Sequence, residues 1–103
     1  MAATEIVDKT QETIILAALE HFQIDENTLV TGTKYHIAYM RWCVFLLVKN
    51  NTMLSQASIG RRLGKNQFCV RNGIQNLQHR IKFETVIKKD IANISKIAGL
   101  LQD

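Results

Sequence analysis

At 103 residues the chain is long enough for one modest hydrophobic core and too short for a catalytic domain beside a separate reader domain, so we expect a single domain over residues 1–103. Hydrophobic residues make up 47% of the chain and charged residues 21%, which argues against wholesale disorder, and the most apolar run, residues 42–48, is far shorter than the roughly 20 residues of a membrane span. The polar, acidic start lacks the apolar core of a signal peptide, so we expect a cytoplasmic protein with no membrane partner.

The net charge of +4 conceals a separation of charge along the chain. Residues 1–33 carry a formal charge of −5, whereas residues 34–89 carry +10 and contain Glu84 as their single acid. A one-sided basic segment is typical of a protein that binds a polyanion. The charge pattern therefore favours a nucleic-acid partner over a basic surface without a partner.

Residues 1–48 are predicted to form helices, because their apolar residues recur at helical spacing. A first helix over about residues 4–22 places Ile6, Val7, Ile14, Ala17, Ala18 and Leu19 toward the core. Asp25 then caps a short helical turn that places Leu29 and Val30 inward. Gly32 ends that turn, because it adopts backbone angles that its neighbours resist. The next helix, about residues 34–48, is apolar nearly all round, as expected of a central helix wrapped by others.

Three further helices are predicted after residue 54, which makes an all-α bundle of about five to six helices. Ser55 caps a short helix of about residues 56–63, Gly64 ends it in a left-handed conformation, and Asn66 caps a helix of about residues 66–82. That helix buries one face, formed by Val70, Gly73, Ile74, Leu77 and Ile81. A last helix, about residues 85–101, turns inward Val86, Ile87, Ile91, Ile94, Ile97, Ala98 and Leu101.

The stretch "IGRRLGKNQFCVRNG", residues 59–73, decides between a phosphate-binding loop and a DNA-binding bend. A phosphate-binding loop needs four residues between its glycines and a Ser or Thr after the lysine, whereas here three residues separate Gly60 from Gly64 and Asn66 follows Lys65. A helix-turn-helix needs a small residue where two helices approach, a residue tolerant of positive φ in the turn and an apolar anchor on the second helix. Gly60, Gly64 and Val70 supply them, so we expect a helix-turn-helix over about residues 55–82.

The second helix of such a motif lies in the major groove, with its N-terminal residues at base edges. The face opposite the buried one gives the base-reading candidates, which are Asn66, Gln67, Phe68, Arg71, Asn72 and Gln75. Two of them have a competing interpretation. Asn66 either caps the helix or reads a base, and Phe68 either packs on the preceding helix, which is slightly favoured, or touches a thymine methyl group. Arg61, Arg62 and Lys65 suit contacts to phosphates, which position a protein without reading sequence.

Several motifs resemble the C-terminal DNA-binding domain, domain IV, of the bacterial replication initiator DnaA. "SQASIG" at 55–60 is similar to that family's Ser-Leu-Pro-Glu-Ile-Gly, Leu63-Gly64 to its Phe-Gly turn, and "NQFCV" at 66–70 to its Asp-His-Thr-Thr-Val signature. Upstream, "HFQIDENTLV" and "YHIAYM" match the family's preceding turn and helix start, so the likeness covers nearly the whole chain in order. The resemblance implies a helical fold like those of domain IV and the Trp repressor, and a double-stranded DNA partner.

The departures from the family fall where it reads DNA. Asn66, Gln67 and Phe68 replace the Asp, His and first Thr that contact bases in the family, which implies a different target site. The family's minor-groove arginine falls at Tyr35, with Lys34 beside it, so these two residues complete the DNA-backbone candidates. The family's ATPase domain is not part of this sequence. The resemblance therefore implies a stand-alone DNA reader in transcription regulation or DNA replication that uses no nucleotide.

An enzyme is not expected, and neither is a catalytic residue, a cofactor or a metal site. His21, His36 and His79 are scattered without a nucleophile or a carboxylate partner at catalytic spacing, and Cys43 and Cys69 lack metal-ligand spacing and suit the core. One alternative function stays open. In this alternative the chain is a protein-interaction module that keeps the DnaA-like fold, and its diverged recognition helix docks on a protein. The acidic N-terminal helix would be a natural contact surface for such a partner.

Overall fold

The computed structural model describes residues 8–100, and this part of the chain forms six helices and no strand, which confirms the all-α prediction. The helices are α1 (Lys9–Phe22), α2 (Glu26–Thr31), α3 (Tyr35–Asn51), α4 (Gln56–Arg62), α5 (Gln67–Arg80) and α6 (Thr85–Ala98). None of the helices in residues 8–100 combines the length and the apolar character needed to cross a lipid bilayer.

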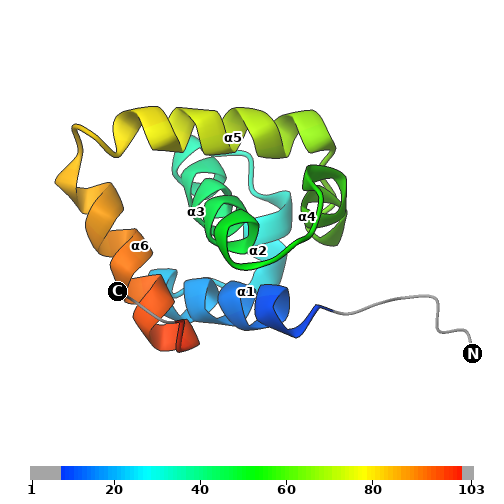
Figure 1. Ribbon diagram of the computed structural model, residues 1–103, viewed down its shortest axis with the longest axis horizontal. Coiled ribbons are helices and arrows are strands. Elements are labelled where there is room, and N and C mark those ends of the chain that lie inside the picture. The colour runs from blue at the N-terminus through cyan, green and yellow to red at the C-terminus, as the bar shows by residue number, and fades with distance from the viewer. Residues whose placement is uncertain (1–7, 101–103) are drawn as a thin grey trace, which may run out of the picture.

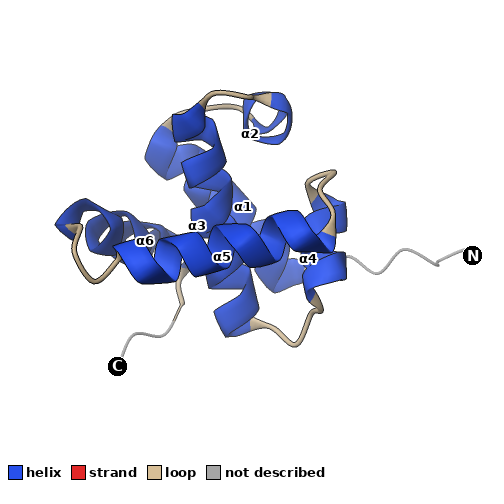
Figure 2. Ribbon diagram, turned by 90° about the horizontal axis from the view of Figure 1, so that it is seen from above, coloured by secondary structure: helices blue, strands red, loops and turns tan. Residues whose placement is uncertain are grey.

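Helix α3 is the centre of the bundle. Helices α1 and α5 lie on opposite sides of it, and α6 leads from one end of α5 back to α1 (Figure 1). Seen from above, α5 passes across α3, with α4 beside its first turn (Figure 2). Because α3 packs against each of the other five helices, its buried residues lie all around its axis. They are Ile37, Arg41, Cys43, Val44, Phe45, Leu46, Leu47 and Val48. The prediction of a central, apolar helix is confirmed.

The core receives fully buried side chains from all six helices. Phe45 of α3 is the largest of them, and Ile14, Ile59, Leu77 and Ile94 bring α1, α4, α5 and α6 against it. Burying a side chain of this size stabilises a fold by about 1.5–3 kcal/mol. The shared core therefore fixes α4 and α5 relative to the rest of the molecule.

Three helix ends differ from the predicted ones for local reasons. Helix α1 begins at Lys9, where the Asp8 carboxylate accepts the backbone N–H of Gln11 at 2.8 Å, and the predicted start at residues 4–7, including Ile6 and Val7, lies outside the described residues. Helix α3 continues to Asn51, whose side chain donates to the Leu47 carbonyl. Helix α6 ends at Ala98, before Gly99 at φ 75°, and Leu101 lies outside the described residues.

For two residues of α6 the predicted burial is wrong. Val86 and Ile97 are exposed, whereas Ile87 and Ile94 are fully buried. Helix α6 packs mainly against α1 and has a weaker contact with α3, so it buries only a narrow stripe. A residue 100° away from that stripe reaches solvent even when it is apolar.

The role predicted for Gly32 is also wrong. Its φ of −62° and ψ of 138° are angles that any residue adopts. A Cβ at this position would instead lie 2.7 Å from both Cγ2 of Ile37 and the carbonyl oxygen of Thr28. Gly32 is therefore required by the lack of space between α2 and α3.

A candidate nucleic-acid interface

Helices α4 and α5 form the predicted bend. A Cβ on Gly60 would lie 2.5 Å from the Lys65 carbonyl oxygen and 2.9 Å from Cγ2 of Val70, so only glycine allows the two helices to approach this closely. Gly64 in the turn has φ +70°, and Val70 is fully buried on α5. The small contact residue, the left-handed turn residue and the apolar anchor are all confirmed.

Side-chain caps define the starts of both helices. The Ser55 hydroxyl accepts the backbone N–H of Ser58 at 3.1 Å, and Oδ1 of Asn66 accepts the N–H of Cys69 at 2.9 Å. Bidentate recognition of adenine needs both the oxygen and the nitrogen of an amide side chain. Since the Asn66 oxygen is used by its own helix, capping is the interpretation that the structure supports.

The outward face of α5 is rich in amide side chains and lacks any acid. Its exposed residues include every remaining base-reading candidate, and together they are Gln67, Phe68, Arg71, Asn72, Gln75, Asn76, Gln78 and His79. Asn76, Gln78 and His79 were not among the candidates, although counting 100° per residue from Val70 and Leu77 places them off the buried face. No Asp or Glu occurs from residue 27 to residue 83, so no carboxylate of α4 or α5 repels a polyanion.

Phe68 does not pack away against α4. Its side chain is 60% exposed, and the aromatic ring pairs found in residues 8–100 do not include it. On a helical wheel Phe68 lies nearly opposite the buried line of Val70 and Leu77. Of its two interpretations, the structure favours a ring that points outward, beside Arg71 and Asn72 on the following turn.

An open depression of about 430 Å³ lies where α4 meets the start of α5. It is lined by Ala57, Arg61, Gly64, Lys65, Asn66 and Gln67. Arg61 is exposed and Lys65 is half-buried. Two cations therefore stand beside a helix N-terminus, which itself carries a partial positive charge, and this combination suits a phosphate group.

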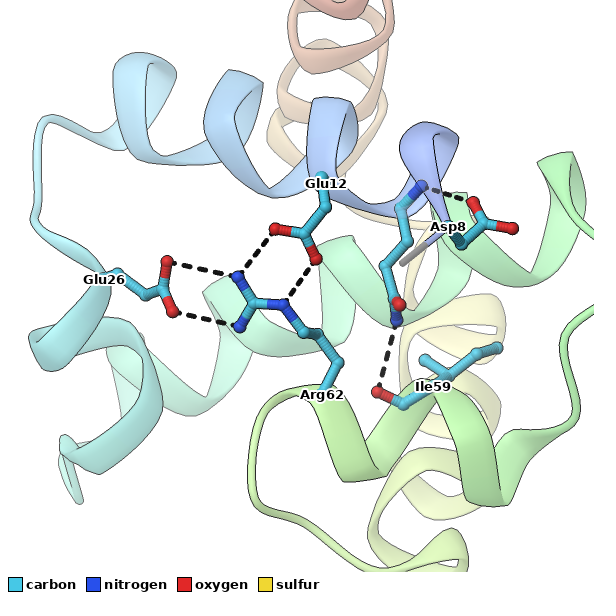
Figure 3. Close-up of polar contacts among 6 residues, drawn as sticks. Asp8, Glu12, Glu26, Ile59 and Arg62 are labelled. Carbon is cyan, nitrogen blue, oxygen red and sulfur yellow. Dashed lines mark hydrogen bonds and ion pairs between the residues drawn. The ribbon is translucent and has the colours of Figure 1, made fainter. Parts of the chain in front are cut away.

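Arg62, the third predicted phosphate contact of this region, forms ion pairs with two carboxylates of the protein itself. Its guanidinium lies between the carboxylates of Glu12 on α1 and Glu26 on α2, with N–O distances of 2.8 Å to Glu12 and 3.0 Å to Glu26 (Figure 3). The hydrogen bond from Arg62 lowers the pKa of Glu26, and the two carboxylates raise the pKa of Arg62. Arg62 thus ties α1 and α2 to α4, and we assign it a positioning role in place of a phosphate contact.

The ion pairs of Arg62 also use carboxylates of the acidic N-terminal segment, residues 1–33. Glu12 and Glu26 face Arg62, while Asp8 and Asp25 cap α1 and α2. Most of the described N-terminal carboxylates are therefore satisfied within the chain. The structure offers little unpaired acid on α1 and α2 for a protein partner.

Lys34 and Tyr35 lie at the far end of the candidate interface. Both are exposed, and the Tyr35 hydroxyl accepts a hydrogen bond from Arg80, the last residue of α5. Arg80 also forms an ion pair with Glu84 at 2.8 Å. The structure therefore brings Lys34 and Tyr35 to the C-terminal end of α5, while Arg61 and Lys65 lie at its N-terminal end.

The basic surface is smaller than the sequence charge implies. Arg41 is buried and donates to the carbonyl oxygens of Leu29 and Gly32 at 2.8 and 2.9 Å, and Arg62 and Arg80 form internal ion pairs. Among residues 8–100, five cations on and around α4 and α5 make no ion pair, and they are Lys34, Arg61, Lys65, Arg71 and Lys82.

His21 has a carboxylate partner that the sequence did not reveal. Its Nε2 lies 2.8 Å from Oδ1 of Asp90, and the Tyr39 hydroxyl donates to Oδ2 of the same carboxylate at 2.6 Å. Burial, followed by the hydrogen bond to Asp90, raises the pKa of Tyr39. Asp90 lies 69 residues from His21 along the chain, so spacing could not have linked them. The cluster joins α6 to α1 and α3.

Residues 8–100 contain no group of three or more His, Cys, Asp or Glu side chains that could hold a metal ion.

Comparison with known proteins gives no match to a family model, a curated protein or a solved structure. The likeness to DnaA domain IV therefore stays a prediction from motifs.

Proposed function

We propose that the chain binds double-stranded DNA, with α5 lying in the major groove. The observation that carries this proposal is the outward face of α5, where amide side chains surround Arg71 on a helix whose opposite face packs in the core. Amides and arginine are the side chains that pair with purine edges in the major groove. The absence of carboxylates from residues 27–83 leaves this face free of charge repulsion toward DNA.

The cations flanking α5 supply the phosphate contacts of the proposal. Arg61 and Lys65 line the depression at the start of α5, and Lys34 lies at its end with the exposed Lys82 just beyond Arg80. A 14-residue helix is about 21 Å long, so cations at its two ends reach phosphates on both sides of a groove about 12 Å wide. Phosphate contacts of this kind fix the register in which the helix meets the bases.

As a biological role we propose a DNA reader that acts in transcription regulation or beside the replication machinery. The motif resemblance to DnaA supports this role. The acidic helices give the protein-interaction alternative little support, because Glu12 and Glu26 are paired with Arg62, so that alternative depends on docking through α5.

Fluorescence anisotropy of a labelled random-sequence duplex, titrated with the protein at salt concentrations from about 50 to 200 mM, tests the proposal. Neutralising about five phosphates predicts a log–log slope of affinity against salt near −4. Lys65→Ala should lower that slope by about 1. Lys96→Ala is the matched control, because Lys96 is exposed on α6, whose C-terminal half packs at the α1 side of the bundle away from α5 (Figure 1).

A slope near zero, or no binding at the lowest salt, would overturn the DNA proposal and leave protein docking as the function to test. An equal loss of slope in Lys65→Ala and Lys96→Ala would show binding through net charge alone. That result would remove α5 as the specific contact.

A further inference from the structure

Phe68 is the one large apolar side chain that α5 turns outward. Its 60% exposure contrasts with Val70, Ile74 and Leu77, which the core covers. The residues three and four positions further along are Arg71 and Asn72, and Gln75 follows on the same face. The ring is therefore one member of a continuous surface whose other members are hydrogen-bonding side chains.

The chemistry of that surface matches one kind of base pair better than the other. In the major groove an A·T pair presents the N6 and N7 atoms of adenine, which an amide side chain binds in a bidentate way, and the 5-methyl group of thymine, which takes an apolar contact. Asn72 and Gln75 supply amides, and Phe68 supplies the apolar surface. Each of the three has a partner on an A·T pair.

A G·C pair leaves most of this surface unused. The donor that cytosine presents in the major groove is best accepted by a carboxylate, and α5 has none. Guanine is bound best by arginine or lysine, and Arg71 is the only cation on the outward face between the first and last turns of α5. The face therefore accommodates one guanine among A·T pairs.

We infer that α5 reads A·T base pairs in the major groove, with the Phe68 ring against thymine methyl groups, the Asn72 and Gln75 amides on adenine, and Arg71 on an adjacent guanine. This inference rests on the proposed DNA-binding function. It assigns Phe68 as a specificity-determining residue that acts through one methyl group per thymine.

Three short hairpin duplexes test it, with alternating d(A-T), alternating d(A-U) and alternating d(G-C) stems. Uracil lacks only the 5-methyl group, which projects into the major groove, so the d(A-U) stem keeps the pairing and the minor-groove edge of d(A-T). We expect d(A-T) to bind about 10-fold more tightly than d(G-C), and d(A-U) to bind several-fold more weakly than d(A-T).

Phe68→Ala should bind d(A-T) and d(A-U) with equal affinity. Phe83→Ala is the matched control, because Phe83 is 75% exposed but lies in the turn after α5, so this variant should keep the difference between the two stems. Circular dichroism of both variants verifies that they keep the helical content of the wild type.

The outcomes separate this inference from the function on which it rests. Salt-dependent binding that is equal for all three stems would overturn the A·T inference and leave DNA binding standing. A thymine preference that survives in Phe68→Ala would overturn the assignment of Phe68. Failure to bind any stem at low salt would overturn the proposed function itself.

Discussion

The indole ring of Trp42 on α3 occupies the space in which a side chain on Gly73 of α5 would stand. A Cβ on Gly73 would lie 2.3 Å from Cδ1 of Trp42 and 2.8 Å from its Nε1. Trp42 is in turn packed edge-on by Tyr35, whose hydroxyl bonds the end of α5. The crossing of α5 over α3 is thus set by a ring on one helix and a missing side chain on the other.

Gly73→Ala should therefore destabilise the protein, by about 1–3 kcal/mol, because the added methyl group forces α3 and α5 apart. The sign is informative, since Gly→Ala in an unobstructed helix interior stabilises by up to about 1 kcal/mol. Urea unfolding followed by circular dichroism measures the change. Asn76→Ala, at an exposed position on the same helix, is the control and should shift stability by no more than about 0.5 kcal/mol.

Gly64→Ala and Gly99→Ala should each cost about 1–2 kcal/mol, because both glycines have positive φ, +70° and +75°, that an L side chain adopts with strain. Their effects on DNA should differ. Gly64 forms the turn before α5, whereas a Cβ on Gly99 would have no neighbour within 4 Å. We expect Gly64→Ala to weaken duplex binding and Gly99→Ala to leave it unchanged under conditions where both variants are folded. Equal affinities would show that the turn does not set the position of α5.

Arg62→Ala should lower the free energy of unfolding by about 1 kcal/mol, a value kept small because the ion pairs with Glu12 and Glu26 are partly solvated. The loss should shrink in high salt, which screens such pairs. Arg61→Ala removes the same charge from an exposed neighbour and should leave stability nearly unchanged. Denaturant titrations at low and high salt measure both. An Arg62→Ala variant as stable as the wild type would remove the tie between α1, α2 and α4.

The ion pair between Arg62 and Glu26 predicts that the free energy of unfolding depends on pH in the acidic range. Because Arg62 lowers the pKa of Glu26 below its ordinary 4.5, the folded state binds fewer protons there than the unfolded state. The stabilisation is fully present above pH 4.5 and is lost as the pH falls through the lower, folded pKa. The stability gap between wild type and Arg62→Ala should accordingly narrow in acid. A gap that stays constant between pH 6 and about pH 3 would contradict this reading of the pair.

The two cysteines should differ in reactivity. Cys43 is fully buried, and burial raises the pKa of its thiol to about 12, whereas Cys69 is half-buried near the start of α5. Because the thiolate is the nucleophile, a thiol-reactive disulfide reagent at pH 8 should modify Cys69 first and Cys43 only on unfolding. Cys69→Ser should abolish the fast phase. A fast phase that survives in Cys69→Ser would show that Cys43 is reached in the folded protein.

The elements that periodicity and capping residues govern were predictable. Asp25, Ser55 and Asn66 cap the helices that follow them, and Gly60 and Gly64 make the bend, because each of these roles depends on neighbours within a few residues. Two of the helix ends that differed depend on the side chains of Asp8 and Asn51, whose bonding is optional, and the third depends on the left-handed conformation of Gly99.

Contacts between distant parts of the chain were not predictable. Nothing in the spacing of Arg62 distinguishes it from Arg61, yet one pairs with carboxylates 50 and 36 residues away and the other is exposed. The sequence likewise counted Arg41 as part of a basic segment, although the fold buries its charge against backbone carbonyls. A formal charge is a property of composition, whereas a charged surface depends on which side chains the fold leaves unpaired.

The packing of α6 on α1 has a consequence for how the molecule is made. Since the last helix closes onto the first, through contacts such as Asp90 with His21, the most distant parts of the described chain must meet before the bundle is complete. Loop-closure entropy opposes such a meeting until most other contacts exist. A nascent chain that has only reached α5 exposes the part of the apolar side of α1 that α6 covers in the complete bundle, so we expect α4 and α5 to reach their final stability only together with the whole bundle.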